Sequence, residues 1–249
     1  MNIIVLVKQT PDSTTKVKIA ADDKTLDAAE VKYIVNPFDE YAIEEALQIK
    51  ERLGGEVTVL GLGPERASTA LRTALAMGVD KAMHIVADDT HLDSHTVASA
   101  LAQVLKETQF DLILMGKQAI DDYNEQIGPR LSALLDIPCL TYLAKIELGD
   151  GKLEAHREVE GGVEVIECTF PAILTVEKGI NEPRYAPLKG IMLAKKKPID
   201  QKSVELEPPK IVIKKMEYPP ERPPGRIVGE GVEAVSELVR LLREEAKVI

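Results

Sequence analysis

Polar side chains suited to nucleotide recognition follow Gly116, next to the predicted start of a helix. Backbone amides at a helix start, with Asn124 and Gln126 beside them, can hold a phosphate. Asp121 and Asp122 would repel a phosphate, so we expect their carboxylates to face amides, a ribose hydroxyl or the amino group of adenine. The glycine itself permits a close approach of the backbone. The block therefore predicts a phosphate-binding site.

A second stretch, residues 176–197, combines apolar side chains with lysines. Pro183, Pro187 and Gly190 forbid a continuous helix, so we expect an ordered loop. Its apolar residues are either tucked inward, as a loop that caps the core before a solvated lysine run, or offered to a partner. An apolar anchor ringed by lysines has the composition of a docking surface for an acidic protein. The apolar residues are Leu188, Ile191 and Met192, and the lysines are Lys189, Lys195, Lys196 and Lys197.

The glycines of Gly61-Leu62-Gly63-Pro64 invite comparison with a dinucleotide-binding fingerprint. Ala67 stands where the third glycine is needed, and the proline interrupts the pattern. We therefore expect these glycines to let a turn pass close to another strand or to a ligand.

Two histidines, His91 and His95, flank Asp93 and could in principle ligate a metal. Asp93 or Ser94 is the better candidate for the cap of a helix over residues 96–106, which leaves the histidines on no common face. No serine or cysteine stands with a histidine at the spacing of a catalytic motif, so the sequence does not predict an enzyme.

The polar stretches lie at the ends of predicted strands. Continuous apolar runs are typical of strands buried on both faces of a parallel sheet, and here they alternate with amphipathic helices. This alternation predicts an α/β fold with a doubly wound, mostly parallel sheet, which binds ligands at the carboxyl ends of its strands. We expect Asp39 to cap the first helix and Phe38 to fix its entry. The predicted strands cover residues 2–7, 56–60, 82–86, 111–115 and 172–176, and the helices 40–53, 65–77 and 96–106.

Residues 143–176 change character. Two turn signals, Asp150-Gly151 and Gly161-Gly162, separate segments that alternate between apolar and polar residues. The segments cover residues 145–148, 153–159 and 163–169. They predict an antiparallel meander appended to the parallel sheet.

From Lys202 the composition shifts to proline, lysine and glutamate. Such a segment cannot bury enough apolar surface to fold alone, which indicates an extended arm. The arm ends in a predicted amphipathic helix over residues 232–245, and a lone helix of this kind needs a receptor surface. We therefore expect an α/β domain over residues 1–200, and an arm with a helix over residues 201–249.

The composition argues against several classes of protein. Acidic residues number 41 against 31 basic residues, and a formal net charge of -10 makes non-specific nucleic-acid binding an unfavourable interpretation. The two cysteines, Cys139 and Cys168, are too few and too far apart for a disulfide framework or a zinc site. No run approaches the ~20 apolar residues of a membrane span, and a strand pattern starts at once without a signal peptide, so we expect a cytoplasmic protein.

Four blocks resemble one family at consistent spacing over about residues 1–200. The blocks, residues 8–12, 36–39, 116–128 and 181–198, are similar to those of the electron transfer flavoprotein beta subunit. The resemblance implies an adenine nucleotide alpha hydrolase-like fold and one half of a heterodimeric electron carrier. It implies FAD held mainly by the alpha subunit and a structural AMP in this chain. Electrons would pass from acyl-CoA-type dehydrogenases to the electron transfer flavoprotein quinone oxidoreductase.

The resemblance also implies which residues bind. Those that match the nucleotide blocks are Leu6, Lys8, Asn36, Pro37, Phe38, Asp39, Leu62, Gly116, Lys117, Gln118, Ala119, Ile120, Asp121, Asp122, Asn124, Glu125, Gln126 and Ile127. Those that match the recognition loop over residues 181–197 are Tyr185, Leu188, Ile191, Met192, Lys195 and Lys196, with Leu188 as the anchor and the arm wrapping the alpha subunit. The chain departs from the family at Tyr123, in place of an acid, at Glu125, in place of an asparagine, and at Ile127, in place of a threonine.

Two alternatives stay open. In the bifurcating branch of the family, the nucleotide site holds a second FAD instead of AMP, and Gly128-Pro129 and Pro11-Asp12 lean that way, whereas residues 36–42, Lys117 and residues 181–186 lean towards AMP. The second alternative is a stand-alone adenine-nucleotide-binding sensor or a related amidating enzyme. Such a protein would need neither the loop around Leu188 nor the arm.

Overall fold

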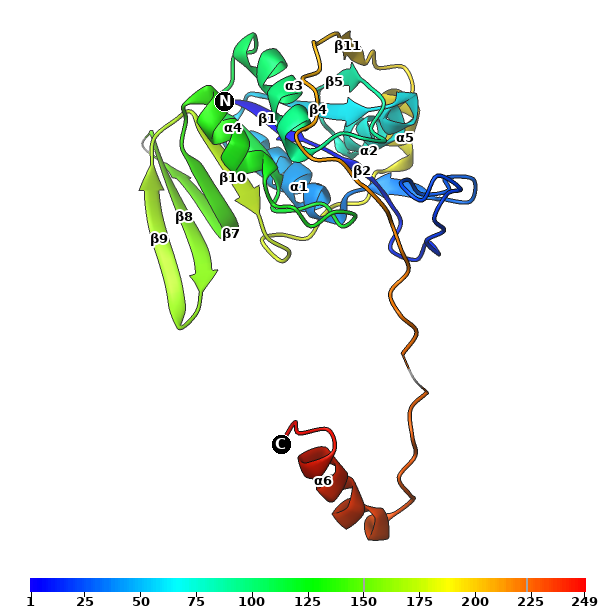
Figure 1. Ribbon diagram of the computed structural model, residues 1–249. Helices are drawn as coiled ribbons and strands as arrows, with labels where there is room; N and C mark the ends of the chain where they lie inside the picture. The colour runs from blue at the N-terminus through cyan, green and yellow to red at the C-terminus, as the bar shows by residue number, and fades with distance from the viewer. Residues whose placement is uncertain (150, 223) are drawn as a thin grey trace. The chain divides into compact units, whose positions relative to one another are not determined.

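The computed structural model describes residues 1–149, 151–222 and 224–249, which form two compact units, Met1–Met216 and Glu217–Ile249. The strands of the first unit are β1 Asn2–Leu6, β2 Gln9–Pro11, β3 Tyr33–Val35, β4 Glu56–Gly63, β5 Lys81–Val86, β6 Leu112–Gly116, β7 Cys139–Gly149, β8 Lys152–Val159, β9 Gly162–Cys168, β10 Ala172–Val176 and β11 Asp200–Lys202. Within the described residues, one sheet has the strand order β11-β5-β4-β1-β6-β10-β7-β8-β9, and β2 pairs with β3 apart from it (Figure 1).

Helices connect most of the parallel strands. In the first unit they are α1 Pro37–Leu53, α2 Ser68–Met77, α3 Ser94–Lys106, α4 Ile127–Leu135 and α5 Leu188–Ala194, with a 3-10 turn η1 at Glu65–Ala67. The second unit contains the 3-10 turn η2, Val232–Ala234, and the helix α6, Val235–Glu244, where the sequence predicts a helix. Among the described residues, every helix is too short or too polar to reach across a bilayer. The domain boundary at residue 200 stays a prediction.

The predicted α/β fold with a mostly parallel sheet is confirmed. The strands from β11 to β7 in the spatial order run parallel, and β7, β8 and β9 form the predicted antiparallel meander. The three-residue strands β2, β3 and β11 were not predicted, because so few residues carry no readable period. Asp150, in the predicted turn between β7 and β8, lies outside the described residues.

The strand β4 extends further than its apolar run predicts, as far as Gly63, so the expected turn begins later. A Cβ atom on Gly61 would lie 3.0 Å from the carbonyl oxygen of Val7. The glycine therefore serves the close approach of a neighbouring strand, which is one of the two roles that the sequence predicts for it.

Helices cover both faces of the sheet (Figure 1). The helices α1 and α2 share one buried cluster with Ile3 and Val5 of β1. The helices α3 and α4 share a second cluster with Ile4 and Leu6 of the same strand. Because successive side chains of a strand point to opposite faces, the buried part of β1, Ile3 to Leu6, must be apolar at every position.

The chain reverses its direction of winding at β1. It passes from β1 through α1 to β4 and through α2 to β5, and then returns through α3 to β6 on the other side of β1. In such sheets, the connections leave the carboxyl ends of the two central strands in opposite directions and open a crevice between them. Here the crevice is expected at the ends of β1 and β6.

A polar clamp holds the segment before α5 on the surface of α1. The guanidinium of Arg184 donates to both carboxylate oxygens of Glu44, from Nε at 2.7 Å and from Nη2 at 2.9 Å, and its Nη1 lies 2.5 Å from Oε1 of Glu51. Asn181 donates to the carbonyl oxygen of Tyr41 and to Glu45, at 3.0 Å each. Glu44 is only 5% exposed, so this bidentate pair takes the place of its lost hydration.

The expectation of a loop over the whole of residues 183–190 is wrong at its end, because α5 begins at Leu188. Pro187 occupies the position before the first helical residue, where its missing N–H costs nothing. Gly190 lies inside the helix. The position needs glycine because a Cβ atom there would lie 2.3 Å from the carbonyl oxygen of Ala76 in α2. Pro187 therefore marks the start of α5, and Gly190 marks a close contact between α5 and α2.

Replacement of Arg184 by glutamine should destabilise the chain by about 2 kcal/mol near pH 7, because it leaves the Glu44 carboxylate buried without its partner. Burial works to raise the pKa of Glu44, but the hydrogen bonds and charge of Arg184 outweigh it and hold the pKa below its usual value. Such a carboxylate stabilises the fold above the unfolded-state pKa of about 4.3, and the effect is lost as the pH falls through the folded-state pKa.

The measurement is urea unfolding of Arg184→Gln and of the unaltered chain, near pH 7 and at steps below pH 4. The difference in unfolding free energy should shrink over the acidic steps, as Glu44 becomes protonated. Lys81→Gln is the matched control, because Lys81 contacts Glu56 at 2.8 Å on the open surface, where ion pairs contribute about 0–1 kcal/mol. An equal loss of unfolding free energy in both variants would show that the clamp does not stabilise the fold more than a surface ion pair does.

Candidate functional site

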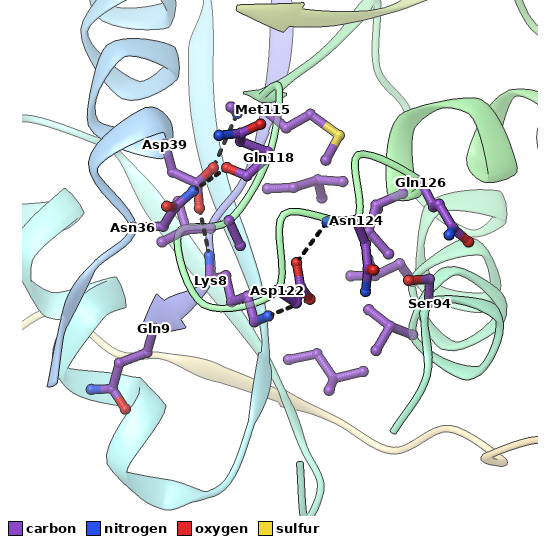
Figure 2. Close-up of a pocket in the computed structure, with 18 of the residues that line it drawn as sticks. Lys8, Gln9, Asn36, Asp39, Ser94, Met115, Gln118, Asp122, Asn124 and Gln126 are labelled. Atoms are coloured by element: carbon purple, nitrogen blue, oxygen red, sulfur yellow. Dashed lines mark hydrogen bonds and ion pairs between the residues drawn. The ribbon is translucent and has the colours of Figure 1, made fainter. Parts of the chain in front are cut away.

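A pocket of about 160 Å³ lies where the winding reverses, at the carboxyl ends of β1, β4 and β6 (Figure 2). Fourteen of the residues that the sequence singles out for nucleotide binding line it: Leu6, Lys8, Asn36, Asp39, Leu62, Gly116, Lys117, Gln118, Ala119, Asp122, Asn124, Glu125, Gln126 and Ile127. The other four, Pro37, Phe38, Ile120 and Asp121, are not part of this lining. Segments distant in sequence are therefore brought together in one crevice.

Asp39 ties the two strands at the base of the pocket together. Its Oδ2 accepts the backbone N–H of Lys8 at 2.8 Å, and its Oδ1 accepts the backbone N–H of Gly116 at 3.0 Å. Burial raises the pKa of Asp39 to about 7, although both N–H groups work to lower it. The expectation that Asp39 caps α1 is wrong: Pro37 takes the first helical position, so the helix starts earlier and Asp39 points from its first turn to the sheet.

Asn36 fixes the start of the loop over residues 117–126. Its side-chain Nδ2 donates to the carbonyl oxygen of Gln118 at 2.8 Å, and its Oδ1 accepts the N–H of Ile120 at 3.2 Å. The side chain is almost fully buried, so both bonds are protected from water. The amide thus acts as a template that shapes one wall of the pocket.

Lys8 reaches across the pocket to the same loop (Figure 2). Its Nζ lies 2.9 Å from a carboxylate oxygen of Asp121 and 2.9 Å from one of Asp122. Burial works to lower the pKa of Lys8, but the two carboxylates outweigh it and the pKa is raised. The two acids thus face an ammonium group, which the sequence did not predict, whereas the expected amide partner is found for Asp122. Asp122 also accepts the N–H of Asn124 at 3.1 Å.

The helices α3 and α4 both start at the pocket, and of these two only α3 has a side-chain cap. Asp93 caps α3, accepting the N–H of Thr96 at 2.8 Å, as predicted. The helix α4 follows Gln126 and has no side-chain cap, because Oε1 of Gln126 accepts hydrogen bonds from Arg130 instead. The backbone N–H groups at the start of α4 are therefore the ones available to an anion.

The far end of the loop is held by aromatic and charged side chains. Tyr123 and Glu125 have φ angles of 52° and 56°, in the left-handed region that non-glycine residues rarely adopt. The hydroxyl of Tyr142 donates to the carboxylate of Glu125, which raises the pKa of Tyr142 to about 12. Lys117 lies over the Tyr142 ring, 4.8 Å from its centroid, and pairs with Glu177 at 2.6 Å. The charge of Glu125 is thereby engaged away from Lys8.

Several lining residues were missed by the sequence interpretation. They come from β2, from β6, from the segment between β5 and α3, and from α3 itself, and they include Gln9, Asp89, Leu92, Asp93, Ser94, Val97 and Met115. Gln9 donates to Thr69 at 2.6 Å and accepts from Arg66, which also pairs with Asp89. The residues between β5 and α3 reach the pocket because β5 lies two strands from β1 in the sheet, an order that no local sequence pattern contains.

The segment over residues 181–197 presents an apolar surface on α5 and just before it, hereafter the α5 surface, formed by Tyr185, Leu188, Ile191 and Met192. Tyr185 is 97% exposed and Leu188 is 75% exposed, and Lys195 and Lys196 lie beside them on the surface. Lys197 does not belong to the lysine fringe, because its Nζ donates to the carbonyl oxygen of Val79 at 2.7 Å.

Alanine in place of Gly116 should lower the unfolding temperature of the chain. A Cβ atom there would lie 2.5 Å from Cβ of Phe38 and 2.7 Å from Oδ1 of Asp39, so α1 has to move away from β6. Overpacking of this kind costs about 1–3 kcal/mol, or roughly 4–8 °C at the middle of that range. Thermal unfolding followed by circular dichroism measures the shift.

Gly162→Ala is the matched control, because a Cβ atom on Gly162 meets nothing within 4 Å. Its unfolding temperature should stay within about 1 °C of the unaltered chain, since alanine is no less favourable than glycine in a strand. Equal unfolding temperatures for the two variants would show that α1 and β6 do not pack as closely as described.

The chain matches the family described as electron transfer flavoprotein domain over residues 23–207. An electron transfer flavoprotein subunit beta from Bacillus subtilis is 45% identical over the full length of both chains. Proteins of the same description from Bradyrhizobium diazoefficiens and Homo sapiens are 41% and 37% identical, over the full length of this chain and at least 99% of theirs. Together with the doubly wound fold, these similarities show that the chain belongs to the electron transfer flavoprotein beta subunit family.

Proposed function

We propose that the chain is the beta subunit of a heterodimeric electron transfer flavoprotein. In this role it carries electrons, together with an alpha subunit, from primary dehydrogenases such as acyl-CoA dehydrogenases to a quinone oxidoreductase. The observation that carries the proposal is the combination, in a full-length member of the family, of a pocket suited to a nucleotide and a separate exposed α5 surface. The chain has no catalytic constellation in this proposal and acts as a carrier subunit.

The proposed ligand of the pocket is AMP. The uncapped N–H groups at the start of α4 can receive the phosphate, with Asn124 and Gln126 beside them. The positive charge of Lys8 offsets part of the negative charge of Asp121 and Asp122, and the engagement of Glu125 by Tyr142 removes a second source of repulsion. Apolar groups on the opposite wall, such as Leu62, can contact the base. AMP in this position supports the structure and takes no part in redox chemistry.

The redox group of the proposed complex is an FAD held mainly by the alpha subunit, and it supplies the electron transfer. The residues of this chain recognise the partners. Leu188 projects from α5 as an apolar anchor, and burial of such a side chain in a pocket of the donor contributes most of the local binding energy. Lys195 and Lys196 attract an acidic donor surface and mainly raise the rate of encounter. The clamp of Arg184 on α1 keeps this surface ordered before binding, which lowers the entropic cost.

Leu188→Ala should lower the rate of flavin reduction by an acyl-CoA dehydrogenase by at least about tenfold, the loss expected for an anchor worth 1.4 kcal/mol or more. The FAD content and unfolding temperature of the heterodimer should not change, because Leu188 is 75% exposed and truncation of a surface side chain is nearly neutral for stability. Flavin absorbance during anaerobic mixing with the reduced dehydrogenase gives the rate.

Val17→Ala is the control for this test, because Val17 is an equally simple apolar residue, 53% exposed on a different loop. The flavin of the Val17→Ala heterodimer should be reduced at the same rate as that of the unaltered heterodimer. If Leu188→Ala loses flavin together with activity, or if both variants slow equally, the assignment of the α5 surface to docking is wrong.

The nucleotide content provides the direct test of the pocket. The chain should be co-expressed with the alpha subunit, and the heterodimer should release one FAD and one AMP on denaturation, as measured by chromatography against standards. Two FAD per heterodimer would replace the AMP assignment by the bifurcating alternative. A chain that purifies alone and hydrolyses or senses ATP would overturn the carrier proposal.

A further inference from the structure

The segment over residues 203–211, hereafter the strap, follows β11 and lies along α3. At its beginning, the side-chain amide of Gln103 donates to the carbonyl oxygen of Glu205 at 2.8 Å and accepts the N–H of Glu205 at 3.1 Å. Both backbone groups of one strap residue are thereby satisfied by a single side chain. Gln103 thus takes the place of a neighbouring strand in holding the strap.

The middle of the strap is held through the side chain of Glu207. Its Oε1 accepts the hydroxyl of Ser99 at 2.5 Å, and its Oε2 lies 2.8 Å from Nε2 of His95. His95, Ser99 and Gln103 are spaced by four residues, so they form one row along α3. The strap therefore runs antiparallel to the helix, towards the helix start.

The strap ends on Asp93. Its Oδ2 accepts the backbone N–H groups of Lys210 and Ile211, at 2.6 and 3.1 Å, while Oδ1 caps α3. Burial works to raise the pKa of Asp93, but the backbone hydrogen bonds outweigh it and lower the pKa to about 2. The carboxylate is therefore charged at neutral pH and serves both the helix and the strap.

The same residue is part of the pocket. Asp93 lines it together with its two neighbours, Leu92 and Ser94, while Gln103, Ser99 and Glu207 do not. We propose that Asp93 is a positioning residue that couples occupancy of the pocket by the adenine nucleotide to attachment of the strap. A ligand seated against Leu92 and Ser94 limits the motion of the Asp93 backbone, and the two N–H bonds of the strap hold only while the carboxylate keeps its place.

The coupling is reciprocal by linkage. If the nucleotide holds the strap on α3, then the strap must hold the nucleotide in the pocket by the same free energy. Couplings between sites typically change an affinity by about 5–150-fold. The inference rests on the proposed nucleotide function of the pocket, but it concerns a different part of the chain, because the residues that fasten the strap along α3 lie outside the pocket lining.

The double variant Gln103→Ala/Glu207→Ala tests the coupling, because it loosens the strap without altering a lining residue. The full-length chain in its complex is loaded with tritiated AMP, and release is followed by filter binding after dilution into unlabelled AMP. Release from the variant should be about tenfold faster than from the unaltered complex. Glu205→Ala is the matched control, because Glu205 holds the strap through its backbone, and it should release AMP at the unaltered rate.

Limited trypsin digestion of the unaltered complex provides a second measurement that does not depend on the variant folding. Cleavage after Lys210, quantified by mass spectrometry, should be about tenfold slower with saturating AMP than without it. The coupling is overturned if the complex binds AMP but cleavage after Lys210 is unchanged. It is also overturned if the double variant and the control release AMP at equal rates. Either outcome leaves the nucleotide proposal intact. Failure of the unaltered complex to bind AMP overturns both.

Discussion

The rest of the pocket depends on the two backbone hydrogen bonds that the carboxylate of Asp39 accepts. By accepting one backbone N–H from the end of β1 and one from the end of β6, it joins the two strands where the winding of the sheet reverses. The N–H group of Gly116 is buried and that of Lys8 is partly buried, and Asp39 is the acceptor for both. Burial makes the charged form of the acid costly, as its raised pKa shows, so the two hydrogen bonds are strong electrostatic constraints in a site of low dielectric.

Charges around the pocket are arranged in pairs, so that none of the engaged carboxylates acts on a ligand with its full field. Lys8 is placed between Asp121 and Asp122, Glu125 receives the Tyr142 hydroxyl, and Asp93 is surrounded by backbone N–H groups. The start of α4 differs, since no side chain caps it. An acidic pocket can therefore offer one local site of positive potential, set by the helix dipole and its free amides rather than by a surplus of basic residues.

Much of the fold could be predicted, because a strand buried on both faces needs an uninterrupted apolar sequence, as in residues 3–7 and 112–115. The helix α5 could not, because Pro187 and Gly190 break helices in most contexts, and only the contact with Ala76 explains the glycine. In the pocket, residues 116–127 follow the end of a predicted strand, whereas residues 36–39 were assigned to it only through the resemblance to the family. Leu92 and Ser94 could not be assigned to it, because their approach depends on the spatial order of the strands, which no local pattern contains.

The helix α1 carries both Asp39, at the pocket, and Glu44 and Glu51, which hold the segment leading to α5. The helix α1 therefore sets the distance between the pocket and the segment leading to α5, which is about 18 Å from Asp39 to Glu51 at 1.5 Å per residue. A single residue inserted between Asp39 and Glu44 would rotate the clamp by about 100° relative to the strand ends. The length of α1 therefore fixes both the distance and the relative orientation of the pocket at the strand ends and the segment that leads to α5.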